Sequence, residues 1–115
     1  MDFEFPRGDT KVFKFKLQDK NGEKLSLSVS DRLFLTAKKN HKSTEVIFQK
    51  TIGNGIELKD DGYYYVTIYP DDTNNLNYGT FGYDIEIKTA TGIVKTLCIG
   101  SITLTEEYTF KGDEI

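Results

Sequence analysis

The sequence contains one cysteine, one histidine and no tryptophan. A single cysteine, Cys98, excludes an internal disulfide and a zinc site built on several cysteines. Cys98 lies in an apolar run, which predicts a buried, unreactive thiol. The histidine, His41, stands between lysines in a polar segment, which is typical of a solvated loop rather than of a catalytic relay. We therefore predict no catalytic residues, no cofactor and no enzymatic activity.

Long apolar runs and basic clusters are also missing. No stretch approaches the roughly 20 apolar residues of a membrane-spanning helix. The N-terminus carries the acids Asp2 and Glu4 and has no long apolar stretch, so it does not resemble a secretory signal. The net charge of −3 offers no basic footprint for nucleic acid. We expect synthesis in a cytoplasm, with neither membrane nor nucleic acid as a partner.

The residues that are abundant favour β-structure. Eight phenylalanines and seven tyrosines supply much of the apolar bulk, and aromatic side chains suit a pleated, half-buried surface. The 115 residues show no internal repeat, linker or shift in composition, so one domain is predicted over 1–115. Within it we expect an N-terminal arm at 1–9 and a loose acidic tail at 106–115.

Alternation of apolar and polar residues predicts seven to nine short strands, the pattern of an antiparallel sandwich or small barrel. Pro70 and the aspartates after it predict one short helical turn near 71–76. Gly100 divides the last run and indicates a bulge or a close backbone approach. The predicted strands cover 13–17, 25–29, 33–38, 46–52, 56–58, 63–69, 81–87 and 93–105.

One segment favours a sandwich of the immunoglobulin type. Residues 79–83 follow the short helical connection and open a late strand, as the aromatic corner of such sandwiches does. The cysteine pair and core tryptophan of antibody domains are absent, so the comparison concerns architecture alone.

Four aspartates, Asp60, Asp61, Asp71 and Asp72, raise the question of calcium, which prefers oxygen ligands. Their spacing matches no EF-hand loop. A turn at Asp61-Gly62 and a helix cap at Asp71-Asp72 account for them, so we predict structural roles and no metal site.

The tyrosines at 63–69 are the segment most open to a binding role. In a strand, Tyr64 must point to one face, and Tyr63, Tyr65 and Tyr69 to the other. The face that Tyr64 shares with its apolar neighbours is predicted to be core. The second face is either a partner surface or another buried layer, and as a partner surface it could bind proteins or saccharides.

The N-terminal arm offers a second candidate interface. Phe3 and Phe5 could pair with a neighbour's strand edge, although we prefer that the arm completes its own sheet. Arg7-Gly8-Asp9 matches the integrin tripeptide, but we interpret Gly8 as a bend and its neighbours as local hydrogen-bonding groups. The candidate partner interface thus comprises Phe3, Phe5, Arg7, Asp9, Tyr63, Tyr65 and Tyr69.

A series of short motifs runs along the chain in a fixed order. They are Phe-x-Phe-x-Arg-Gly-Asp at 3–9, Gly-Ile-x-Leu at 55–58, Asp-Gly-Tyr-Tyr at 61–64, Pro-Asp-Asp-Thr at 70–73 with Leu76, Gly-Thr-Phe-Gly-Tyr-Asp-Ile at 79–85, Thr-Leu at 96–97 with Gly100, and Glu-Tyr-Thr at 107–109. The set resembles the immunoglobulin-like N-terminal domain of baseplate upper proteins and related tail proteins of phages of Gram-positive bacteria.

The resemblance implies a structural role in a phage or prophage virion, through contacts with other virion proteins and with homo-oligomerisation left open. It supplies no catalytic residue. Relatives of that kind often trimerise and carry host adhesion, whereas no coiled coil or adhesin head follows within these 115 residues, and Phe81 stands where tyrosine is usual. A connector, accessory or decoration protein of the virion is therefore the expected role, with a carbohydrate-binding module as the alternative.

Overall fold

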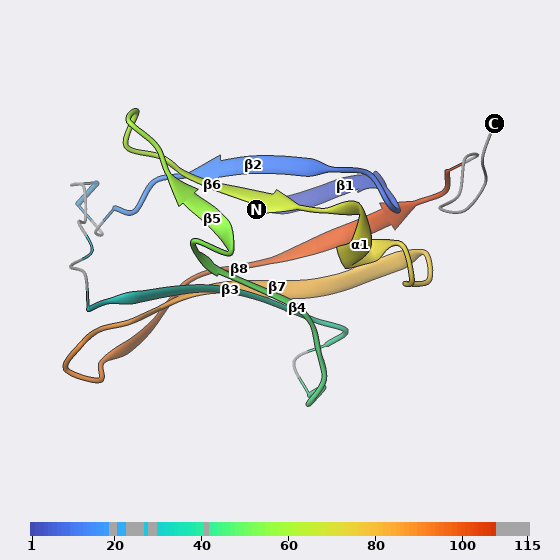
Figure 1. The fold of residues 1–115 in the computed structure, drawn as a ribbon. Coiled ribbons are helices and arrows are strands. Elements are labelled where there is room, and N and C mark those ends of the chain that lie inside the picture. The colour runs from blue at the N-terminus through green and yellow to red at the C-terminus, as the bar shows by residue number, and fades with distance from the viewer. Residues whose placement is uncertain (19–20, 23–26, 28–29, 41, 108–115) are drawn as a thin grey trace.

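The computed structural model describes residues 1–18, 21–22, 27, 30–40 and 42–107. Two layers of strands face one another in it, with β2, β5 and β6 above β3, β4, β7 and β8 (Figure 1). The predicted all-β class is confirmed, because eight strands and one short helix make up the described regular structure. The strands are β1 Asp2–Pro6, β2 Lys11–Phe15, β3 Arg32–Lys38, β4 Val46–Ile52, β5 Gly55–Leu58, β6 Tyr64–Ile68, β7 Gly79–Lys88 and β8 Val94–Thr105, and the helix is α1 Pro70–Thr73.

The strand order is that of an immunoglobulin-like sandwich. Hydrogen bonds connect the strands as β1-β8-β7-β3-β4-β5-β6-β2. The run β8-β7-β3-β4 corresponds to strands G, F, C and C′ of such folds, and β5-β6-β2 to D, E and B. The layers join where β4 and β5 pair in parallel at Thr51↔Gly55 and Ile52↔Ile56. Helix α1 makes the connection from β6 to β7, close to its predicted place.

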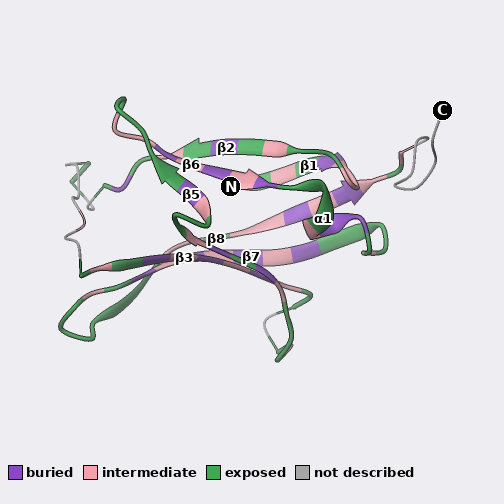
Figure 2. Ribbon diagram, viewed as in Figure 1, coloured by how far each residue is buried: buried purple, intermediate pink, exposed green. Residues whose placement is uncertain are grey.

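The core lies between the layers and follows the alternation of each strand. Tyr64, Val66 and Ile68 of β6 are buried, as the pattern predicts. Buried positions alternate with exposed or half-buried ones along most strands (Figure 2). The fully buried large side chains are Leu33, Leu35, Ile56, Val66, Ile68, Thr73, Ile85, Ile102 and Leu104.

Strand β1 completes the molecule's own sheet, as we preferred from the sequence. It pairs in parallel with the end of β8, from Asp2↔Ser101 to Pro6↔Thr105. Gly100 permits this approach, since a Cβ there would collide with the Met1 carbonyl oxygen and lie 2.8 Å from the Tyr83 ring. The predicted close approach at Gly100 is thus confirmed. The β-bulge lies nearby at Leu97, where the register with β7 shifts.

Tyr83 predicts a loss of stability at alkaline pH. Its buried hydroxyl donates to the Met1 carbonyl oxygen at 2.6 Å. Burial, with smaller effects of Cys98 and Asp2, raises the pKa of Tyr83 well above its ordinary value of 10.0. Because the pKa is higher in the folded state, this contribution is complete below about pH 10 and is lost as the pH rises further. We expect the free energy of unfolding, measured with urea between about pH 9.5 and pH 11.5, to fall more steeply than in Tyr83→Phe. Parallel pH curves would contradict this.

Some sequence predictions concern parts of the chain that the structure does not describe. His41 and, apart from Leu27, the predicted strand over 25–29 lie outside the described residues. Within 19–26 the structure describes only Asn21 and Gly22, and Gly22 has a φ of 82°. Among the residues that are described, no helix is long and apolar enough to cross a membrane.

Candidate functional site

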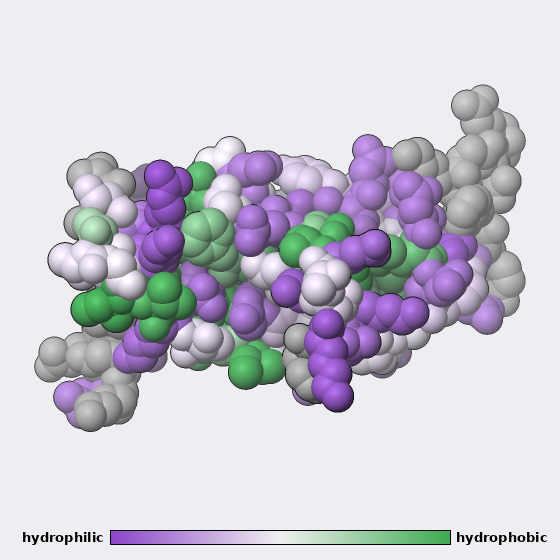
Figure 3. Space-filling view, turned by 90° about the horizontal axis from the view of Figure 1, so that it is seen from below, coloured by the Kyte–Doolittle hydropathy of each residue, from purple (hydrophilic) through white to green (hydrophobic). Residues whose placement is uncertain are grey.

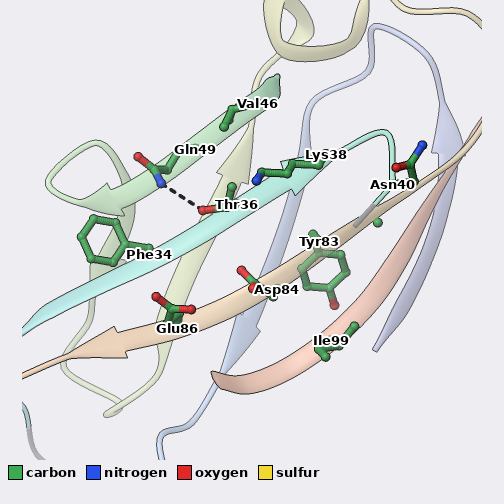
Figure 4. Close-up of a pocket in the computed structure, with 11 residues that line it drawn as sticks. Phe34, Thr36, Lys38, Asn40, Val46, Gln49, Tyr83, Asp84, Glu86 and Ile99 are labelled. Atoms are coloured by element: carbon green, nitrogen blue, oxygen red, sulfur yellow. Dashed lines mark hydrogen bonds between the residues drawn. The ribbon is translucent and has the colours of Figure 1, made fainter. Parts of the chain in front are cut away.

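A groove of about 550 Å³ lies on the outer face of β3, β4, β7 and β8 (Figure 4). We call it the sheet-face groove. Gly82 of β7 helps to form it, because a residue without a side chain keeps that part of the face low. The lining residues are Phe34, Thr36, Lys38, Asn40, Val46, Gln49, Gly82, Tyr83, Asp84, Glu86 and Ile99.

Strand register fixes the middle of the groove. Thr36 lies opposite Gln49 of β4 on one side and Asp84 of β7 on the other, and Asp84 lies opposite Ile99 of β8. Residues directly opposite one another share a face of the sheet. The Gln49 side-chain amide donates to the Thr36 hydroxyl at 3.0 Å, which fixes one wall (Figure 4).

Two carboxylates make part of the sheet-face groove acidic. Asp84 and Glu86 project from the same face of β7 and are half-buried, and neither has a hydrogen bond or ion pair among the described residues. Ile99 is 77% exposed beside Asp84, and Phe34 lies opposite Glu86. Carboxylates next to exposed apolar groups suit a partner that carries both basic and apolar side chains.

The second outer face, on β2 and β6, carries tyrosines covered by lysines. The Nζ atoms of Lys14 and Lys16 lie 4.4 and 4.6 Å from the centre of the Tyr63 ring, and that of Lys59 lies 4.4 Å from the Tyr65 ring. Both tyrosines are half-buried. The question left open by the sequence is thereby answered in part: this face is not a second buried layer.

Asp61 has a local role on that face. Its carboxylate accepts hydrogen bonds from the Tyr65 hydroxyl at 2.5 Å and from the Tyr63 backbone N–H at 2.9 Å. The bond from Tyr65, followed by the one from Tyr63, lowers the pKa of Asp61. The same bond raises the pKa of Tyr65. These contacts fit the predicted turn at Asp61-Gly62.

Tyr69 is 51% exposed and stands at the start of α1. The Asp72 carboxylate accepts from the Tyr69 N–H at 2.7 Å and from Lys50 Nζ at 2.5 Å. Lys50 points inward from β4 and lies 4.9 Å from the centre of the Tyr69 ring. Asp72 is therefore both a helix cap and half of a largely buried ion pair, which agrees with its predicted structural role.

The two phenylalanines of the arm point into the sandwich. Phe5 is only 6% exposed, and the half-buried Phe3 packs against Phe13 with ring centres 4.3 Å apart. Because Phe5 belongs to the core, its prediction as an interface residue does not fit the folded chain. Phe3 presents only part of its surface.

Arg7 is also drawn inward, against its prediction as an interface residue. The guanidinium donates to Glu107 Oε1 at 2.7 and 3.1 Å and to the Leu76 carbonyl oxygen at 2.9 Å. These bonds join distant parts of the chain, so the predicted local role was wrong for Arg7. Gly8 makes the expected bend, with φ 83°, and Asp9 is exposed. Glu107, anchored in this way, is not part of a loose tail, and 108–115 lie outside the described residues.

Cys98 and the acidic residues complete the predicted sites. Cys98 is half-buried rather than buried, with its sulfur 3.8 Å from the Met1 amino group. Within the described ranges, no three His, Cys, Asp or Glu side chains gather as a metal site would require.

No protein-family model and no curated protein matches this chain. The resemblance to phage tail domains therefore rests on the motifs alone.

Sequence reasoning did not find the sheet-face groove. The signal was present in the acids Asp84 and Glu86 between the core residues of β7, and in Phe34, placed among apolar residues on both faces of β3. What the sequence could not give was which strands lie side by side.

Proposed function

We propose that this protein is a structural component of a phage or prophage virion, such as a baseplate, tail or fibre component or connector, which acts through protein–protein contacts. It would be made in the cytoplasm of the bacterial host and function in the particle. The ordered motifs support this role, and the observation that carries it is the sheet-face groove. Its exposed Ile99 and unpaired acids stand on a rigid sheet, as a binding surface for a protein requires.

The groove and its surroundings suit such contacts better than the N-terminal arm does. In the arm, Phe5 is buried in the molecule's own core, and Arg7 forms an ion pair with Glu107. By contrast, Val94, Ile99 and Val46 are each about half exposed or more. Figure 3 shows apolar side chains scattered among polar ones on the surface seen from below.

Saccharide binding by the tyrosines is less favoured by the contacts. Sugars stack on open aromatic faces, whereas lysine ammonium groups cover Tyr63 and Tyr65. A sugar would have to displace these groups. Titration of glucan and of cell-wall oligosaccharides with and without Tyr65→Ala would reveal such binding, and a saturable signal lost in the variant would favour the alternative.

The virion role can be tested in the strain that encodes the chain. After prophage induction, particles purified by density gradient are expected to contain the protein at a fixed ratio to the major tail proteins. Ile99→Lys is expected to reduce incorporation at least about tenfold, because a charge would enter an apolar contact. Val12→Lys, at a 52% exposed position of β2 away from the groove, is the matched control. Particles that lack the chain would refute the proposal.

A further inference from the structure

One half of β8 has an open edge. Strand β1 pairs with β8 only from Ser101 to Thr105, whereas β7 pairs with β8 from Val94 to Leu104. Along 94–99, the backbone groups that point away from β7 thus have no strand partner among the described residues. Six residues of extended backbone, about 20 Å long, present free donors and acceptors there.

Two of the three outward side chains of this open segment, those of Val94 and Ile99, are apolar, and the third is the polar Thr96. Val94 is 53% exposed and Ile99 is 77% exposed, and both lie on the outer face opposite Lys88 and Asp84. The one charged residue, Lys95, lies opposite the buried Ile87 and so belongs to the other face. Lys95 is exposed on that other face, so the outer face of 94–99 carries no charged side chain of β8.

Two other strands with open edges, β2 and β4, carry lysines that discourage pairing. Strand β2 places Lys14 on its outer face, and Lys16 follows it. Strand β4, paired with β5 over only two residues, points Lys50 inward. Exposed lysines and inward charges are common means by which proteins prevent edge-to-edge pairing. At 94–99 the only lysine, Lys95, lies away from the outer face, so a strand that presents its side chains to that face meets no lysine of β8.

The side chains of the neighbouring strand β7 indicate which kind of segment could bind at 94–99. Glu86 lies opposite Thr96, and Asp84 opposite Ile99, so two half-buried carboxylates flank the open segment. A strand added outside β8 would lie about 10 Å from β7, within reach of an extended arginine or lysine. Apolar residues on either side of that basic residue would cover Val94 and Ile99.

We propose that the open edge of β8 at 94–99 binds an extended segment of another protein that presents a basic residue between apolar ones to the outer face. The segment would add one strand to the sheet by β-augmentation. Backbone hydrogen bonds would hold it, and Asp84 with Glu86 would select its basic side chain. This inference deepens the proposed assembly role and rests on it for the partner being a protein.

The purified chain can be tested with the peptide acetyl-Thr-Val-Thr-Arg-Thr-Val-amide. Binding is expected to protect the amides of 94–99 from hydrogen exchange, as followed by NMR. Replacing the peptide arginine with glutamate, or Asp84→Asn with Glu86→Gln in the protein, is expected to weaken binding about fivefold. Glu57→Gln, an exposed acid on β5, is the matched control and should change nothing. A peptide N-methylated at alternate residues should not bind.

A second measurement guards against a peptide too short to bind unaided. The same six residues fused before Met1 would continue β1 beside 99–94, since Met1 precedes the Asp2↔Ser101 pair. Protection of 94–99 in the fusion is the expected result.

Protection in neither experiment, or equal binding of the N-methylated peptide, would overturn the inference. So would a dimer in sedimentation that Ile99→Lys abolishes, because the occupant would then be a second copy. None of these outcomes alters whether particles contain the chain, which tests the proposed role separately.

Discussion

Replacing Arg7 with methionine is expected to lower the free energy of unfolding by about 3–5 kcal/mol. Arg7 and Glu107 are 15% and 10% exposed, so removing the guanidinium leaves a carboxylate with little access to water. The Leu76 carbonyl oxygen loses its donor as well. Glu107 Oε2 already has no hydrogen-bond partner among the described residues, so its carboxylate has no other bond that would compensate for the loss of Arg7. Urea denaturation at neutral pH measures the loss.

The two arginines of the chain provide a matched comparison for this ion pair. Arg32→Met removes the same group at an exposed position, and we expect a change within about 0.5 kcal/mol. Adding Glu107→Gln to Arg7→Met should recover part of the loss, because the orphaned charge disappears. Equal effects of Arg7→Met and Arg32→Met would show that the Arg7–Glu107 pair contributes nothing to stability.

Asp72→Asn is expected to lower the free energy of unfolding by about 3 kcal/mol. Asparagine keeps an oxygen that can accept from the Tyr69 N–H, so the substitution chiefly removes the partner of Lys50. The Lys50 side chain is only 7% exposed, and an unpaired ammonium there is poorly solvated. Thermal and urea unfolding should both report the change.

A double variant separates the charge from the packing at this site. Lys50→Met with Asp72→Asn removes both charges and retains an unbranched side chain, and it should restore most of the stability lost in Asp72→Asn. Asp60→Asn, at an exposed turn position, serves as the control. A double variant as unstable as Asp72→Asn would mean that the hydrogen bond to Tyr69, rather than the ion pair, accounts for the effect.

Most strands were predictable because buried positions alternate with exposed or half-buried ones along them. The pattern at 46–52 matches β4 residue for residue, and the short helix falls where Pro70 predicts it. The inward position of Lys50 was hidden, since a lysine in an alternating segment would be placed outside. Only its partner Asp72, brought from 22 residues away, makes burial tolerable.

The candidate site depended on contacts between distant segments. Arg7 looked like a local hydrogen-bonding residue because the sequence does not show that Glu107, 100 positions later, would lie beside it. Likewise, Asp84 and Glu86 of β7 form part of a groove only because Ile99 of β8 and Phe34 of β3 lie opposite them. Alternation gives the face of a residue, but it does not give the neighbours across strands.

The parallel pairing of β1 with β8 has a consequence for biosynthesis. A ribosome releases residues 2–6 long before their strand partner at 101–105 is made. The emerging polypeptide must therefore hold Phe3 and Phe5 without their final neighbours through most of translation. Closure of this pair should come late and slowly, since it joins the most widely separated strands of the sheet.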